Sequence, residues 1–203
     1  MHDHANLTSA GGGPLYSERL IDALGVAARL HAGQPPKATS IPYLAHLIGT
    51  CAIALEYGAN EDQGIAALLH DAIEDVEPTE VARASVWRFG GEVGRIVEAC
   101  TDSDSHPKPP WRERKERYLL HLADADRAVL LVSASDKLHN TRAIVADLRR
   151  VGEALWPRFS RPKEDTLWYY RELIAVFRAN AAHPVDLVDE FDRTVAAMEA
   201  LAR

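Results

Sequence analysis

Histidine and carboxylate side chains that could bind a metal ion occur in three short segments of this 203-residue sequence. His46 lies in an apolar stretch, and Asp136 directly follows a strongly apolar run. The third segment, 69–75, contains His70, Asp71, Glu74 and Asp75. Imidazole nitrogen and carboxylate oxygen form a mixed ligand set that suits Mn, Fe or Zn. We therefore predict a divalent metal site built from these three segments.

The segment 69–75 is predicted to end a helix that opens at Glu61 and runs to about Asp75. Residues four positions apart share a helix face, so the acidic and imidazole groups would crowd one narrow sector. The three carboxylates would repel one another, and a cation held by His70 and Asp71 would remove that repulsion. The alternative is a solvated helix end. The apolar residues just before His70 favour a buried cluster instead.

His46 and Asp136 strengthen this interpretation. Taken alone, His46 is more typical of a satisfied core histidine than of a ligand. An aspartate in the middle of an apolar helix is costly to bury unless it binds a cation or is well hydrogen-bonded, which makes Asp136 informative. Asn140 lies four positions later and is predicted to face the same side of that helix.

The elements that must position these residues are helical throughout, because apolar residues recur at helical spacing and no segment shows sustained strand alternation. Ser17 is a plausible N-cap for the first helix. We predict one all-α domain of roughly eight to ten helices over 15–203, preceded by a flexible N-terminal segment, 1–14. The predicted helices are 17–32, 42–57, 61–75, 78–89, 92–101, 111–123, 127–151, 164–181 and 184–202.

Composition limits the partners. The formal net charge of -7 argues against general binding to nucleic-acid backbone, which relies on Lys and Arg, but it is compatible with a small phosphorylated ligand. The sequence contains no secretory signal and no apolar stretch long enough to span a membrane, so a cytoplasmic protein is expected. Cys51 and Cys100 are the only cysteines, and each is predicted to be a buried, reduced thiol. The oligomeric state is left open.

The order His46, then His70-Asp71, then Asp136 resembles the HD-type metal-dependent phosphohydrolases. More narrowly, the chain is similar to the RelA/SpoT-type alarmone hydrolases, and above all to the free-standing small alarmone hydrolases. The resemblance covers roughly 24–142. The motifs that carry it are Pro42-Tyr43-x-x-His46, Ala67-Leu68-Leu69-His70-Asp71-x-x-Glu74-Asp75, Phe89-Gly90 and Asp136-Lys137-Leu138-x-Asn140.

This resemblance implies an HD-domain helical bundle that removes pyrophosphate from the 3′ position of an alarmone nucleotide. Glu74 and Asp75 would orient or activate the attacking water. The metal, Mn²⁺ in the family with Fe or Zn as alternatives, would be held by His46, His70, Asp71 and Asp136. The predicted substrate-binding residues are Gln34, Lys37, Lys137, Asn140 and Arg142.

One loop departs from the family pattern. Members that act on guanine alarmones commonly carry a Gln-x-Arg-Lys run, whereas this chain has Gln34-Pro35-Pro36-Lys37. Proline can neither stack a guanidinium plane nor donate a hydrogen bond, so Pro36 leaves room for an adenine alarmone or another phosphorylated nucleotide. Two further clusters each have two possible roles. The basic cluster at 108–115 could face either substrate or solvent, and the aromatic cluster at 168–170 could stack a base or belong to the core.

Two other functions are compatible with the sequence. One is an HD nucleotidase or triphosphohydrolase that acts on 5′ phosphates. The other is a nucleotide sensor that keeps the fold without turnover. The Glu74-Asp75 pair favours the alarmone-type enzyme, because it belongs to that pattern and no predicted ligand is missing. A small phosphorylated nucleotide is the expected partner in each case.

Overall fold

A computed structural model describes residues 16–34, 41–105 and 107–203, and every regular element in these ranges is a helix. The prediction of an all-α bundle is therefore confirmed, while the segment 1–14 lies outside the described residues. The elements are α1 (Glu18–Leu30), α2 (Tyr43–Glu56), α3 (Glu61–Leu69), α4 (Ala72–Asp75), α5 (Thr79–Trp87), α6 (Gly91–Cys100), α7 (Trp111–Ala123), α8 (Arg127–Val151), the 3-10 helix η1 (Gly152–Arg158), α9 (Lys163–Ala179) and α10 (Val185–Leu201).

Local side-chain caps explain where several of these helices begin. The Ser17 hydroxyl accepts a hydrogen bond from a main-chain amide of the first turn of α1, as predicted. Asn60 and Gln63 form a reciprocal capping box at the start of α3. The Asp126 carboxylate caps α8 by accepting from two main-chain amides. Helix α3, which leads into His70 and Asp71, and helix α8, which carries Asp136, are therefore fixed at their N-terminal ends by their own sequence.

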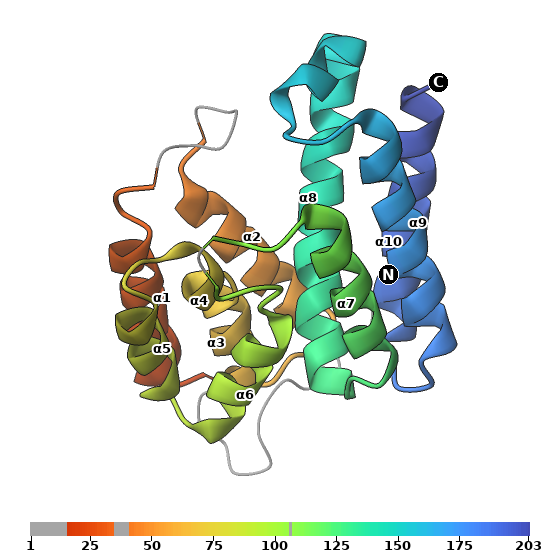
Figure 1. Ribbon diagram of the computed structural model, residues 1–203. Helices are drawn as coiled ribbons and strands as arrows, with labels where there is room; N and C mark the ends of the chain where they lie inside the picture. The colour runs from red at the N-terminus through yellow and green to blue at the C-terminus, as the bar shows by residue number, and fades with distance from the viewer. Residues whose placement is uncertain (1–15, 35–40, 106) are drawn as a thin grey trace.

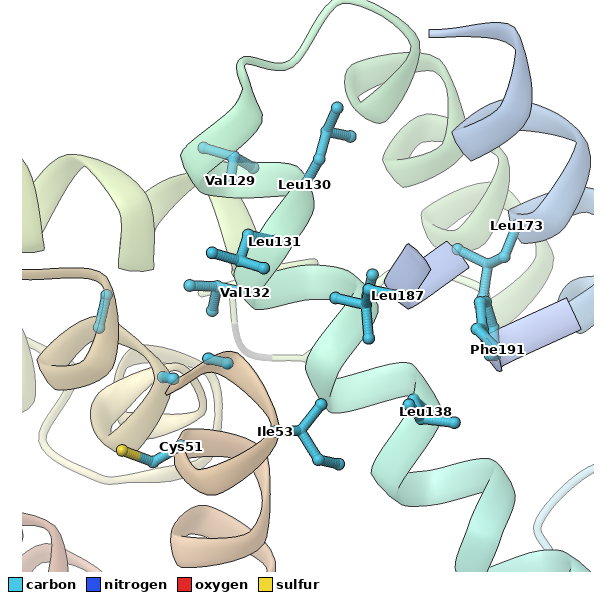
Figure 2. Close-up of a cluster of buried hydrophobic side chains, with 14 of the residues drawn as sticks. Cys51, Ile53, Val129, Leu130, Leu131, Val132, Leu138, Leu173, Leu187 and Phe191 are labelled. Atoms are coloured by element: carbon cyan, nitrogen blue, oxygen red, sulfur yellow. The ribbon is translucent and has the colours of Figure 1, made fainter. Parts of the chain in front are cut away.

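Helix α8 runs through the middle of the molecule and connects its two halves (Figure 1). It packs against α2, α3 and α6 on one side and against α10 on the other, while α7 packs against α9. Buried side chains fill these contacts, among them Ile53 of α2, Leu138 of α8 and Leu187 of α10 (Figure 2). Because α8 contacts both halves, the residues along it are the natural place for a site that several helices share.

The predicted helix 61–75 is wrong in one respect: it breaks after Leu69. The imidazole Nδ1 of His70 lies 2.9 Å from the carbonyl oxygen of Ala67, which would be the acceptor for the main-chain amide of Asp71 in a continuous helix. The chain then turns through His70 and Asp71 and resumes as the short helix α4. The 3-10 helix η1 was not predicted either.

In the part of the chain that the structure covers, we find no helix long and apolar enough to cross a membrane.

Candidate metal centre

The four predicted ligands converge where α2, the α3–α4 turn and α8 meet. The Nε2 atoms of His46 and His70 lie 3.3 Å apart. The Asp136 Oδ1 is 3.3 Å from the first of these nitrogens and 3.5 Å from the second. The Asp71 Oδ2 is 3.4 Å and 3.2 Å from the same two atoms. Two imidazole nitrogens and two carboxylate oxygens therefore face one small space.

The spacing of these atoms fits a coordinated divalent ion. Metal–ligand bonds of about 2.0–2.1 Å at tetrahedral or octahedral angles place neighbouring ligand atoms about 2.8–3.4 Å apart. The separations observed here, 3.2–3.5 Å, lie close to that range. One possible ligand atom from each of His46, His70 and Asp136 lies within 4.8 Å of the other two. The donor set and its geometry thus fit a metal ion.

The protonation of His70 is fixed by its surroundings. Its Nδ1 can only donate to the Ala67 carbonyl oxygen, which is an acceptor, so the neutral ring carries its proton there. The Nε2 lone pair then faces the cluster and is available to a metal. The side chain is 3% exposed, so water offers no competing partner.

The electrostatics of the cluster favour a positive charge at its centre. Burial lowers the pKa of His70, but the carboxylates of Asp71 and Asp136 outweigh it and raise that pKa well above the usual value. Conversely, burial raises the pKa of the Asp136 carboxyl, while Lys137 and the imidazoles outweigh it and bring the pKa well below the usual value. The negative charge of the two carboxylates therefore attracts a cation strongly, and a divalent ion bound between them would neutralise that charge.

Each of the two carboxylates in the cluster is held by further side chains. The Asp71 Oδ2 accepts a short hydrogen bond from the Tyr43 hydroxyl. The Asp136 Oδ1 accepts from the Asn140 amide at 2.6 Å, and its Oδ2 pairs with the Lys137 ammonium. Such outer partners orient a ligating carboxylate and are a common feature of metal sites.

The predicted catalytic pair Glu74 and Asp75 lies next to this cluster on α4. The Tyr43 hydroxyl is 3.3 Å from an oxygen of Asp75 and also donates to Asp71, so it links the pair to the cluster. Lys108 donates to Glu74 at 2.9 Å, and the Arg114 guanidinium lies 3.9 Å from the same carboxylate oxygen. Part of the basic cluster, whose role the sequence left open, thus faces the site rather than solvent.

A cavity of about 220 Å³ lies between α8, α9 and the start of α7. Lys137 and Asn140, both predicted to bind substrate, line it. The Tyr169 hydroxyl is buried, with no hydrogen-bond partner among the described residues. The remaining lining residues are Trp111, Lys115, Ile144, Phe159, Ser160, Arg161, Thr166 and Tyr170. Cations and aromatic rings therefore share this cavity.

The other predicted substrate residues are placed differently. The Gln34 amide donates to the main-chain carbonyl of Asp75 at 3.0 Å, so Gln34 supports the α4 turn. The Arg142 guanidinium lies 3.5 Å from a carboxylate oxygen of Glu190 on α10, and the structure does not bring it to the cluster. Lys37 lies outside the described residues, as does Pro36.

Sequence reasoning missed the role of one more histidine. The Nδ1 of His139 lies 2.9 Å from the Nδ1 of His46, on α8 and α2 respectively. Burial, together with the charge of His46, lowers the pKa of His139 to about 4. Its position three residues after Asp136 places it on nearly the same helix face, which is the signal that could have revealed it.

Comparison with known proteins places this geometry in context. The model of the HD domain family matches residues 23–162. The guanosine-3′,5′-bis(diphosphate) 3′-pyrophosphohydrolase of Danio rerio is 34% identical over 166 residues, which cover 80% of this chain and 87% of that protein. The human enzyme of the same name is 35% identical over 143 residues, covering 68% of this chain and 74% of that protein. The solved structure of a metazoan ortholog of SpoT that hydrolyses ppGpp superposes with a TM-score of 0.67 at 25% identity, covering 87% of this chain and 95% of that one.

Proposed function

This chain belongs to the HD-domain family, and on that premise we propose that it is a metal-dependent hydrolase that removes pyrophosphate from the 3′ position of an alarmone nucleotide. Guanosine tetra- or pentaphosphate and their adenosine counterparts, (p)ppGpp and (p)ppApp, are the proposed substrates. The observation that carries the proposal is the pair Glu74 and Asp75, held beside a cluster of two imidazoles and two carboxylates.

We propose that His46, His70, Asp71 and Asp136 hold the metal, and that the ion is Mn²⁺, with Fe or Zn as alternatives. A divalent ion supplies Lewis-acid chemistry: it lowers the pKa of a bound water and polarises a phosphoryl oxygen. The donor set supports this assignment, because nitrogen and oxygen ligands without thiolate suit these ions.

Glu74 and Asp75 would accept the proton of the attacking water. The water oxygen forms a bond to the phosphorus attached to the 3′ oxygen, and the bond between that phosphorus and the 3′ oxygen breaks. Pyrophosphate and a 3′-hydroxyl nucleotide are the products. Lys108, 2.9 Å from Glu74, would hold the carboxylate in place and partly offset the charge of the incoming phosphates.

The cavity next to Lys137 and Asn140 is the proposed place for part of the substrate. Lys115, Lys137 and Arg161 line it and supply positive charge there. Trp168, by contrast, is covered by the Arg112 guanidinium, 3.2 Å from its ring centroid, so it is not proposed to stack the base. We also propose a cytoplasmic location, which the free thiols of Cys51 and Cys100 support.

The test is product release by the Mn²⁺-loaded protein from a matched set of nucleotides. The set pairs guanosine and adenosine 3′-pyrophosphates with ordinary NTPs and dNTPs. Pyrophosphate from the 3′-pyrophosphorylated nucleotides alone is the expected result, and the guanine-to-adenine ratio would show what Pro36 changes. Turnover of NTPs or dNTPs alone would instead assign the protein to the 5′-acting HD enzymes. Binding without turnover would assign it to nucleotide sensors.

A further inference from the structure

The imidazole of His139 contacts the Nδ1 of His46, whereas the Nε2 of His46 faces His70 and Asp136. The two Nδ1 atoms are 2.9 Å apart, and the ring planes cross at 60° with their centroids 4.8 Å apart. This contact joins two helices, α2 and α8, through side chains 93 positions apart in the sequence.

We propose that His139 is a positioning residue. It accepts a hydrogen bond from His46 and thereby holds His46 in the tautomer and orientation needed to bind the metal. Gly49 provides the space that the His139 ring occupies. The inference rests on the proposed metal site. It concerns how one proposed ligand, His46, is oriented.

The chemistry of the imidazole ring dictates the direction of this hydrogen bond. A neutral imidazole carries one N–H and one lone pair. If the Nε2 of His46 gives its lone pair to a metal, its proton must be on Nδ1. That N–H then requires an acceptor, and the Nδ1 of His139 is 2.9 Å away. His139 in turn keeps its own proton on Nε2.

The two histidine ligands are thus oriented by different means. His70 donates to a main-chain carbonyl of its own helix, which is fixed by the fold. His46 depends on a side chain from another helix, so its orientation can be altered by mutation without touching the main chain. A hydrogen bond of this kind also raises the basicity of the ligating nitrogen.

Gly49 explains how the His139 ring reaches this position. Gly49 lies on α2, three residues after His46, and a Cβ there would be 2.3 Å from both Cδ2 and Nε2 of His139. Such distances are far below van der Waals contact, so an alanine at this position would force the imidazole to move. The absence of a side chain at position 49 therefore allows the His139 ring to reach His46.

The first experiment compares two substitutions of His139 by their affinity for Mn²⁺, measured by competition with a chelating indicator. His139→Phe keeps an aromatic ring but removes the acceptor, and loss of an outer-shell partner of this kind is expected to weaken metal binding by about 10–100-fold. His139→Asn restores an acceptor near the position of Nδ1 and should bind Mn²⁺ more tightly than His139→Phe. The visible spectrum of the Co²⁺-loaded proteins should change with Phe and return toward wild type with Asn.

The second experiment is a double-mutant cycle with Gly49→Ala and His139→Ala. Alanine is the better helix former, so weaker metal binding in Gly49→Ala would not arise from a weakened helix. We expect Gly49→Ala to weaken Mn²⁺ binding when His139 is present and to have little effect when residue 139 is alanine. Circular dichroism spectra would confirm that each variant is folded.

Two results would overturn the proposal. One is Mn²⁺ affinity and a Co²⁺ spectrum in His139→Phe that equal those of the wild type. The other is a Gly49→Ala effect of the same size in both backgrounds. If the wild-type protein itself bound no metal, the proposed metal site would fail along with this inference, whereas tight binding that ignores residue 139 would overturn this inference alone.

Discussion

The imidazole Nδ1 of His70 lies 2.9 Å from the carbonyl oxygen of Ala67, at the position where α3 ends. The same contact orients the ring so that its Nε2 faces His46, Asp71 and Asp136. Because this carbonyl is the acceptor that the Asp71 amide would use in a continuous helix, the break places Asp71 in the turn before α4. The interruption of the helix is therefore part of the proposed metal site.

This contact allows a matched pair of substitutions at position 70. Asparagine can place a donor near the position of Nδ1, so His70→Asn should keep the bond to Ala67 while losing the Nε2 ligand. His70→Ala loses both. We expect both variants to lose metal binding and turnover, with His70→Asn retaining more thermal stability. Titration with Mn²⁺ and thermal unfolding monitored by circular dichroism provide the measurements. Wild-type metal affinity in His70→Asn would remove His70 from the ligand set.

Glu74 offers a test of proton transfer that leaves the metal in place. Glu74→Gln keeps the shape of the side chain and an acceptor for Lys108, but it cannot take a proton from water. General-base groups contribute about 10²–10⁴-fold to rate, so kcat should fall by that order while Mn²⁺ affinity is unchanged. Glu80→Gln, on an exposed position of the neighbouring helix α5, is the control and should behave as wild type. An unchanged kcat in Glu74→Gln would exclude the residue from the mechanism.

The positions of the helices could be predicted because they depend on local interactions. The Ser17 cap and the apolar spacing of α8 are readable from neighbouring residues, and the structure confirms both. The break after Leu69 could not be predicted this way, since it coincides with a hydrogen bond between the His70 side chain and the main chain. Helix propensity alone contains no information about such a contact.

The convergence of the proposed metal ligands was predicted from residue types in apolar surroundings and from the family resemblance, although His46 and Asp136 come from helices far apart in the sequence. The contacts that other side chains make with these residues were not predicted. The approach of Lys108 to Glu74 and of His139 to His46 depends on how whole helices pack. Arg142 shows the converse, since it follows Asn140 closely in sequence but its guanidinium pairs with Glu190 on α10.

The two thiols should be unreactive in the folded protein. Burial raises the pKa of Cys51 to about 11 and that of Cys100 to about 12. At pH 8 a thiol of pKa 11 is about 0.1% thiolate, against roughly a quarter for an ordinary cysteine, and the thiolate is the reactive form. Alkylation by iodoacetamide, followed by mass spectrometry, should therefore be slow in buffer and fast in denaturant. Of the two cysteines predicted to be buried, Cys51 is buried and Cys100 is partly exposed. Rapid labelling of either thiol in the native protein would contradict its raised pKa.

Metal binding should stabilise the folded protein, because the four ligands come together only when α2, α8 and the α3–α4 turn are packed. A ligand present at 100 times its Kd adds about 2.7 kcal/mol to the free energy of unfolding. For a chain of this size, that corresponds to a rise in Tm of roughly 5–10 °C.

The variant that tests this stabilisation is Asp136→Asn, with the exposed Asp124→Asn as its control. Asp136→Asn also leaves Lys137 without its carboxylate partner, which lowers the stability of the metal-free protein. The informative quantity is therefore the change in Tm on adding Mn²⁺, compared within each protein by differential scanning calorimetry. Asp124→Asn should show the full wild-type rise and Asp136→Asn almost none, because the metal then lacks a charged ligand. An equal rise in both variants would mean that the stabilising ion binds somewhere other than this cluster.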